Sequence, residues 1–172
     1  MPETCSTAAG AKAGLSHLLM HAGAKSALFL IAGYFIVRAG SRLIDDYKGL
    51  GRRMPVSAVL FGLAALSLVG APPLFGFFTK FQILSAAAAA GGGIAWFGIA
   101  AILAGTVLEA VYLFRVVRML FTSSEETSLE EMDAPALASV ALFTALVVFG
   151  ALLLPALSSM IGPIASGLST LY

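Results

Sequence analysis

A lysine inside a long apolar segment, close after two prolines, is the residue of this chain best suited to chemistry. Lys80 follows Pro72 and Pro73, and the glycines Gly70 and Gly76 flank the prolines. A charge deep in a membrane costs a few kcal/mol or more, so it is usually paired, hydrated or functional. The prolines interrupt the helix, and broken backbone is tolerated there only beside protein or water. A broken helix that carries an ionisable group is typical of an ion path.

A second set of ionisable residues lies on the preceding apolar segment at intervals of four. His17, His21 and Lys25 form one stripe on a helix, the histidine–lysine stripe. Histidine titrates near neutral pH, so the stripe predicts proton transfer from one membrane surface toward the centre. Two other interpretations stay open: the histidines hydrogen-bond a neighbouring helix, or Lys25 forms a structural ion pair with another subunit. A metal site is not predicted, because the segment offers no Asp, Glu or Cys as a third ligand.

Two lysines are predicted to lie at similar depth, and one carboxylate is available to pair with a lysine. With a rise of about 1.5 Å per residue, Lys25 and Lys80 both lie near the middle of the membrane. Their like charges repel, so a proton that arrives at one site can displace a proton from the next. Glu109 is the only carboxylate in the apolar segments and is the expected counter-charge of a lysine, in this chain or in a neighbour. Tyr112, one turn on, is its candidate hydrogen-bond partner. A purely structural salt bridge is the alternative.

These residues require a helical membrane scaffold, and the composition provides one. The chain has 172 residues, of which 59% are hydrophobic and 11% charged. Apolar runs of about 20 residues predict transmembrane helices, and the period-2 alternation of barrel strands is absent. We expect an all-α integral membrane protein, a single membrane domain over residues 1–172, with about four spans. The spans are predicted at residues 13–37, 55–90 (broken at Pro72–Pro73), 94–121 and 135–157, followed by a C-terminal tail, 158–172.

The placement of basic residues predicts how the chain is oriented. Lysines and arginines concentrate in the loop of residues 38–54 and at the end of the third span. The positive-inside rule therefore makes loops 38–54 and 122–134 cytoplasmic and puts both termini outside, in a multi-pass protein of the cell (cytoplasmic) membrane. Acidic residues count little in this rule. The second loop carries an acidic stretch that we interpret as solvated: Glu125, Glu126, Glu130, Glu131 and Asp133.

Several functional classes are not predicted. The net charge of +1 gives no indication of nucleic-acid binding. Cys5 is the only cysteine, so neither an internal disulfide nor a cysteine metal cluster is expected. Without a nucleotide motif either, we expect no cofactor and no catalytic residues. The first ten residues lack the basic region that begins a signal peptide.

Two stretches of the sequence resemble signatures of antiporter-like proton-channel subunits. The first covers residues 17–33 and contains the histidine–lysine stripe, and the second covers residues 66–84 and contains the double proline with its lysine. Residues 109–115 are similar to the helix that follows in this family, where a Tyr-x-x-Arg pattern is usual. Such subunits occur in respiratory complex I, in Mrp-type sodium/proton antiporters and in energy-converting membrane-bound hydrogenases.

The resemblance implies roles for the ionisable residues. It makes Lys80 the lysine of the second broken helix of the fold, and it puts His17, His21 and Lys25 on a central polar axis. Family members usually have about fourteen helices with two inverted repeats, and this chain resembles only about the last four of those helices. We therefore expect another chain to supply the remaining helices.

The sequence thus predicts a proton- or cation-translocating subunit of a multi-subunit membrane redox or antiporter complex. The complex would be of the NADH-quinone oxidoreductase, hydrogenase or Mrp type, and the expected partners are its other membrane subunits and the lipid bilayer. Two alternatives remain. The chain is a non-conducting structural subunit whose lysines form ion pairs with neighbouring chains, or it is a small exporter that works by homo-oligomerisation.

Overall fold

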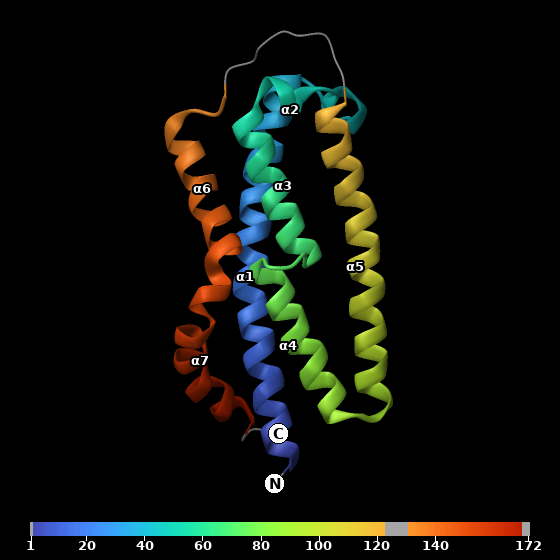
Figure 1. Cartoon of the computed structure of the whole chain (residues 1–172), viewed down its shortest axis with the longest axis vertical. Coiled ribbons are helices and arrows are strands. Elements are labelled where there is room, and N and C mark those ends of the chain that lie inside the picture. The colour runs from blue at the N-terminus through green and yellow to red at the C-terminus, as the bar shows by residue number, and fades with distance from the viewer. Residues whose placement is uncertain (1, 123–130, 170–172) are drawn as a thin grey trace.

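The structure, a computed structural model, is built from helices that run nearly side by side (Figure 1). It describes residues 2–122 and 131–169, and every regular element within them is helical, which confirms the predicted fold class. The elements are α1 (Pro2–Ala39), η1 (Ile44–Tyr47), α2 (Leu50–Arg53), α3 (Pro55–Val69), α4 (Phe75–Ala90), α5 (Gly92–Phe121), α6 (Ala134–Phe149), η2 (Gly150–Leu153) and α7 (Leu154–Ser169).

Three stretches of helix are long and apolar enough to cross a membrane alone: Ala8–Ala39, Gly92–Phe121 and Ala134–Pro163. The number rises to four when the bent pair Ile44–Arg53 and Pro55–Val69, which meet at 116°, is taken as one span. The first helix begins at Pro2, well before the apolar part that the sequence indicates. At the other end, helix continues beyond the fourth predicted span, through η2 into α7.

The broken span predicted over residues 55–90 appears as two helices. α3 and α4 have 15 and 16 residues, so each is shorter than the roughly 20 residues that cross a bilayer. α4 continues downward from the end of α3 in Figure 1. α3 ends at Gly70, whose φ of 94° is a left-handed conformation that favours glycine. The predicted discontinuity at Pro72–Pro73 is therefore confirmed, because both prolines lie between the two helices.

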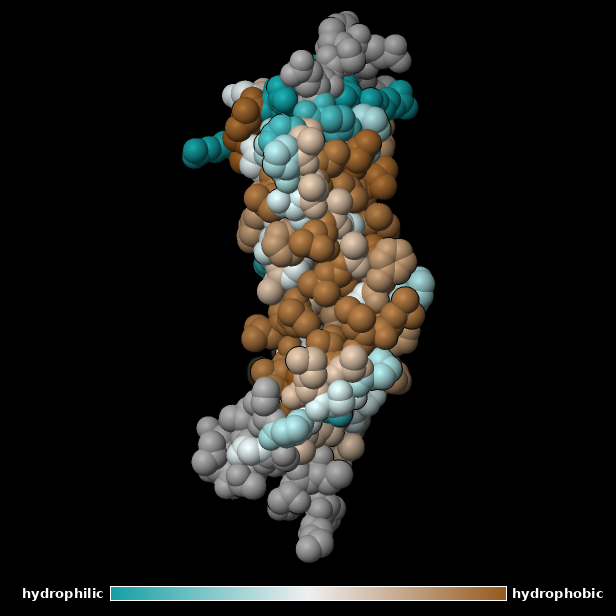
Figure 2. Space-filling model, turned by 90° about the vertical axis from the view of Figure 1, so that its left-hand side faces the viewer, coloured by the Kyte–Doolittle hydropathy of each residue, from teal (hydrophilic) through white to brown (hydrophobic). Residues whose placement is uncertain are grey.

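Helix α1 occupies the centre of the bundle. It contacts α3, α4, α6 and α7, whereas α5 packs against α3 and α4 on the far side (Figure 1). The buried residues of α1 recur at intervals of three or four and so form one helix face: Met20, Ala24, Ala27, Ile31 and Phe35. Figure 2, which views the α6–α7 side, shows a broad apolar band below the polar residues of the upper end. This band is the surface expected of a chain embedded in lipid.

The helix break is held by close contacts with α6. The Ser67 hydroxyl donates to the Val147 carbonyl over 3.0 Å, and the Gly76 N–H donates to the Ser67 hydroxyl oxygen over 3.2 Å. A Cβ atom on Gly76 would lie 1.6 Å from the Ser67 carbonyl oxygen, so only glycine fits at this position. The two half-helices are therefore locked to each other as well as to α6.

The acidic residues before α6 have structural partners. The Glu131 carboxylate accepts bonds from the N–H of Val56 (2.8 Å) and from the hydroxyl of Ser57 (2.6 Å), at the start of α3. A carboxylate at a helix N-terminus satisfies unpaired N–H groups and complements the helix dipole. The Tyr34 hydroxyl donates to Asp133. For Glu131, interpretation as a solvated loop was wrong, whereas Asp133 is exposed and directly precedes α6. The remaining acidic residues of the stretch lie outside the described residues: Glu125, Glu126 and Glu130.

The beginning of α1 and the end of α7 lie at the same end of the bundle, opposite η1 and α2 (Figure 1). This arrangement follows from an even number of crossings, if α3 and α4 count as one crossing and α6 with α7 as another. It agrees with the prediction that both termini share one side of the membrane. Which side that is stays a prediction.

Candidate functional site

The ammonium group of Lys80 lies among three oxygen atoms beside the helix break. Its Nζ is 3.1 Å from each of three acceptors: Glu109 Oε2, Thr106 Oγ1 and the carbonyl oxygen of Val69. A lysine ammonium has three N–H donors, so all of them are used. The side chains of Lys80 and Glu109 are only 14% and 25% exposed. The arrangement therefore holds a charged lysine inside the membrane without leaving a donor unpaired.

The helix break itself supplies part of this site. Carbonyl groups in the last turn of a helix have no partner within the helix, and Val69 is the last residue of α3. Thr106 and Glu109 are three residues apart on α5, so they present their oxygens on one face of that helix. A Cβ on Gly70 would lie 3.2 Å from the Cδ of Lys80, so the glycine also leaves room for the lysine chain.

The histidines of the stripe lie one turn apart and reach toward α4. The ring centroids of His17 and His21 are 5.8 Å apart, and His17 Nδ1 is 3.0 Å from Thr79 Oγ1. Thr79 donates its own proton to the Gly76 carbonyl over 3.1 Å. The threonine oxygen is then the acceptor of a bond from His17 Nδ1–H, which leaves Nε2 of a neutral ring free to take up a proton.

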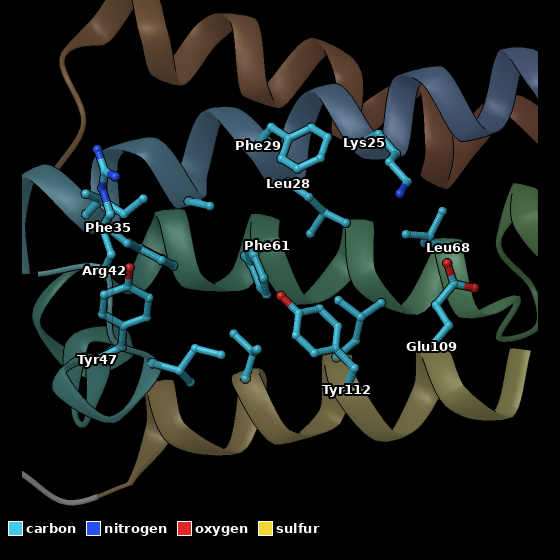
Figure 3. A pocket seen from close by; sticks show the side chains of 15 residues that line it. Lys25, Leu28, Phe29, Phe35, Arg42, Tyr47, Phe61, Leu68, Glu109 and Tyr112 are labelled. Carbon is cyan, nitrogen blue, oxygen red and sulfur yellow. The ribbon is translucent and has the colours of Figure 1, made fainter. Parts of the chain in front are cut away.

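Lys25 occupies a different setting from Lys80. Its Nζ lies 5.9 Å from the centroid of the Phe29 ring, and no carboxylate among the described residues lies within ion-pair distance. It lines a cavity of about 380 Å³ between α1, α3 and α5. Figure 3 shows Lys25 and Glu109 pointing toward one another from opposite walls, with Leu68 nearby. One carboxylate is therefore bonded to Lys80 and also faces the cavity that contains Lys25.

The same cavity extends toward the η1–α2 end of the bundle. Arg42 and Tyr47 line that end, and Tyr112 lies between them and Glu109 (Figure 3). Most of the remaining lining is aliphatic or aromatic. The cavity thus extends from Lys25 and Glu109 at one end to Arg42 at the other, and the space between them is largely apolar.

The structure brings together most of the predicted site residues. Lys80 and Glu109 form an ion pair within this chain, one of the two arrangements expected from the sequence. Tyr112 lines the cavity but makes no hydrogen bond to Glu109 among the described contacts, and Thr106, one turn before Glu109, binds Lys80 instead. The sequence analysis missed Thr106 and Thr79. Thr106 lies one turn before Glu109 and Thr79 directly precedes Lys80, each on an apolar helix, and these positions were the available signal.

Metal ligation finds no support within residues 2–122 and 131–169. No group of three or more His, Cys, Asp or Glu side chains is close enough there to hold a metal ion. The two histidines face a threonine and each other. Their hydrogen-bonding capacity is suited to holding or passing a proton.

Comparison with known proteins gives a consistent result for sequence and structure. Residues 3–108 match the family model described as NADH:quinone oxidoreductase/Mrp antiporter, TM. The chain is 40% identical over 103 residues to NADH-quinone oxidoreductase subunit N of Desulforudis audaxviator, an alignment that covers 60% of this chain and 20% of that protein. The chain thus spans about a fifth of the length of this curated relative.

Two solved structures resemble the whole bundle. A chain of the Mrp complex from Dietzia sp. DQ12-45-1b matches with a TM-score of 0.73 and 27% identity, over 94% of this chain and 38% of that one. A chain of the membrane-bound sulfane sulfur reductase, an archaeal respiratory membrane complex, matches with a TM-score of 0.71 and 28% identity, over 96% of this chain and 31% of that one.

Proposed function

Because the chain belongs to the NADH:quinone oxidoreductase/Mrp antiporter transmembrane family, we propose that it carries part of a proton or cation path through a multi-subunit membrane complex. The observation that carries this proposal is the ion pair between Lys80 and Glu109 at the helix break. A buried pair contributes little net stability compared with apolar residues of the same size, because desolvation offsets the attraction. Its position inside a row of titratable groups is better explained by charge transfer.

The proposed path runs along five titratable residues: His17, His21, Lys25, Glu109 and Lys80. His17 and His21 are neighbours, and Lys25 shares a cavity with Glu109, which pairs with Lys80. Arrival of a proton at Glu109 would neutralise the carboxylate and release Lys80 from its counter-charge. The lysine would then give up a proton more readily, because its charged form has lost a favourable interaction.

We further propose that a second chain completes the path. The bundle corresponds to about a third of each matched chain in the two solved complexes. Among the described residues Lys25 has no carboxylate within ion-pair distance, because Glu109, across the same cavity, is paired with Lys80. A partner helix that carries a polar residue at this depth would supply a partner for Lys25. In the proposed orientation, η1 and α2 lie on the cytoplasmic side of the cell membrane and both termini lie outside.

The test replaces Lys80 with Met, an unbranched side chain one atom shorter that carries no charge. In membrane vesicles that contain the native complex, we expect Lys80→Met to abolish proton flux while the complex keeps its size in mild detergent. Lys48→Met is the matched control, since Lys48 is exposed in the loop before α2, and its flux should equal that of the wild type.

The second candidate is a non-conducting structural subunit, and the ion pair between α4 and α5 is the observation that favours it. This candidate predicts that Lys80→Met dissociates the complex or prevents its assembly. Normal flux in an intact Lys80→Met complex would contradict the transport proposal.

A further inference from the structure

A hollow of about 650 Å³ opens where the loop between η1 and α2 meets the last turns of α5. Figure 1 shows this region at the upper end of the bundle, opposite the two ends of the chain. Three of its lining residues are basic, Lys48 in the loop and Arg115 and Arg118 on α5, and among the described residues no acidic side chain lines it. None of the three lies on the proposed path. The hollow therefore gathers positive charge that the transport proposal does not use.

Close backbone contacts hold Lys48 beside the two arginines. The loop turns at Gly49, whose φ of 74° is a left-handed conformation that favours glycine. The Gly49 N–H donates to the Met119 carbonyl over 3.3 Å. A Cβ on Gly51 would lie 2.8 Å from the Leu120 carbonyl oxygen, so the start of α2 packs directly on the α5 backbone. The fold itself therefore holds the three basic residues around one hollow.

The three basic side chains have no partner within residues 2–122 and 131–169. All three are exposed, and no hydrogen bond or ion pair there involves the Lys48 ammonium or the guanidinium group of Arg115 or Arg118. Arg38 shows the contrast, because at the same end of the bundle it donates to the Glu131 carbonyl. The planar fork of an arginine fits the oxygens of a phosphate, and a lysine adds a point charge. A phosphate is therefore the kind of ligand that suits this hollow.

The length of α5 indicates the depth of the hollow in a membrane. Trp96 and Phe97, at the other end of this helix, are exposed, and aromatic residues of this kind mark a membrane interface. Arg115 follows Trp96 by 19 residues, which is roughly 28 Å at about 1.5 Å per residue. The hydrocarbon core of a bilayer is about 30 Å thick. Arg115 therefore lies at the opposite edge of that core, and Arg118, one turn further, lies at the level of the lipid phosphates.

The side of the hollow nearer the membrane centre is apolar. Val111 and Phe114 line it, each four residues before one of the arginines, and their side chains are 67% and 54% exposed. The exposed apolar face of α5 continues with Leu108 and Val107. A soluble anion uses none of this surface, whereas an acyl chain below a headgroup packs along it. The order of basic and apolar residues along α5 therefore matches that of a phospholipid.

We propose that this hollow binds the headgroup of an anionic phospholipid, with Lys48, Arg115 and Arg118 around its phosphate and an acyl chain along Val111 and Phe114. Three unpaired positive charges at headgroup depth favour a lipid with a net negative charge over a zwitterionic one. In the proposed orientation the lipid belongs to the cytoplasmic leaflet, whose surface is negatively charged. The inference needs only a chain that spans the membrane, so it stands or falls separately from the proton path.

The test compares two lipids in nanodiscs that contain the intact complex. One has a phosphatidylglycerol headgroup and the other a phosphatidylcholine headgroup, and both carry a photoreactive group on the same acyl chain in a matrix of phosphatidylcholine. After irradiation, mass spectrometry of peptic peptides locates the label. Val37 provides the reference for lipid that merely surrounds the bundle, since it is exposed at the same end and adjoins Arg38, which has a protein partner.

We expect phosphatidylglycerol to label Val111 and Phe114 at least about tenfold more than phosphatidylcholine does, relative to the label at Val37. Arg118→Gln should lower this preference about fivefold, because each basic residue near a membrane surface strengthens the binding of an anionic lipid by about that factor. Arg52→Gln is the matched control, since Arg52 is exposed in α2 at the same end and does not line the hollow, and its preference should equal that of the wild type.

Equal labelling by the two lipids in the unmodified complex would overturn the proposal, because the basic residues would then be neutralised within the protein. This comparison needs no variant, so the proposal stays testable if Arg118→Gln fails to assemble. A preference that is unchanged in an assembled Arg118→Gln complex would overturn it as well.

Two further outcomes assign the hollow to another occupant and so overturn the proposal. Label at Val37 but none on α5 from either lipid would show that a neighbouring subunit covers the hollow. Displacement of the phosphatidylglycerol label by inorganic phosphate, but not by sodium chloride of the same ionic strength, would indicate a site for a soluble phosphate. We expect neither, because the acyl chain on the α5 face adds binding that a free phosphate lacks.

Discussion

Two lysines of this bundle, Lys25 and Lys80, have very different surroundings. Lys80 contacts a carboxylate, a hydroxyl and a backbone carbonyl, each at 3.1 Å. Lys25 contacts the face of one phenylalanine and borders a cavity. The difference comes from the backbone, since the break between α3 and α4 exposes the carbonyl that Lys80 uses, whereas α1 is continuous past Lys25.

This difference indicates separate tasks for the two residues. All three donors of Lys80 are satisfied by groups of this chain, so we expect Lys80 to be held in one position. Lys25 borders a cavity, so we expect its position to depend on what occupies that cavity. The region around the helix break is therefore expected to be rigid, and substitutions there should lower stability. At Lys25, on the edge of the cavity, substitutions should change stability little and lower proton flux.

The largest effect is expected at Gly76. The Cβ of Gly76→Ala would overlap the Ser67 carbonyl, so the two half-helices must move apart, at a cost of about 3 kcal/mol or more. Gly33→Ala on α1 is the control, because nothing lies within 4 Å of its Cβ, and it should be neutral or slightly stabilising. Thermal unfolding of the complex in mild detergent compares the two variants. Equal melting temperatures would show that the break is not rigidly packed.

A somewhat smaller effect is expected at Glu109. Glu109→Gln removes the charge that faces Lys80 and leaves its ammonium with neutral acceptors. The pair is only partly buried, so its loss should cost somewhat less than the roughly 3 kcal/mol expected for a fully buried pair. The same unfolding measurement applies. If Glu109→Gln unfolds at the wild-type temperature, the pair is solvated and the contrast between the two lysines disappears.

The smallest effect on stability is expected at Lys25. Lys25→Met removes a charge without a carboxylate partner among the described residues, so stability should change by no more than about 0.5 kcal/mol. Proton flux should nevertheless fall, because the stripe loses its link to the Glu109 cavity. If Lys25→Met destabilised the protein as much as Glu109→Gln, Lys25 would have a strong partner. The contrast between Lys80, with three bonded acceptors, and Lys25, at the edge of a cavity, would then be lost.

Much of this arrangement was accessible from the sequence. Apolar runs located the helices, and the double proline located the break, because proline cannot continue the hydrogen-bond pattern of a helix. The sequence left two partners open for Glu109, a lysine of this chain or a lysine of a neighbouring chain. Position along a predicted span does not decide which chain supplies the partner, so the pairing with Lys80 required the structure.

Other features depend on tertiary structure that spacing does not encode. The Val69 carbonyl and Thr106 join the Lys80 site only because α5 packs against the break in one particular register. The role of Glu131 depends on its position beside the start of α3, 75 residues earlier in the chain. The sequence does not show that Glu131 bonds the start of α3, so the acidic stretch that contains it was interpreted as solvated.

The most direct test is proton flux in the double variant Lys80→Met with Glu109→Gln, measured on vesicles whose complex has been sized in the same preparation. Removing both charges leaves no unpaired ion, so a merely structural pair should be replaceable without loss of assembly. If the pair is a transport station, the complex stays intact and its flux is abolished. An intact complex that moves protons at the wild-type rate would contradict this account.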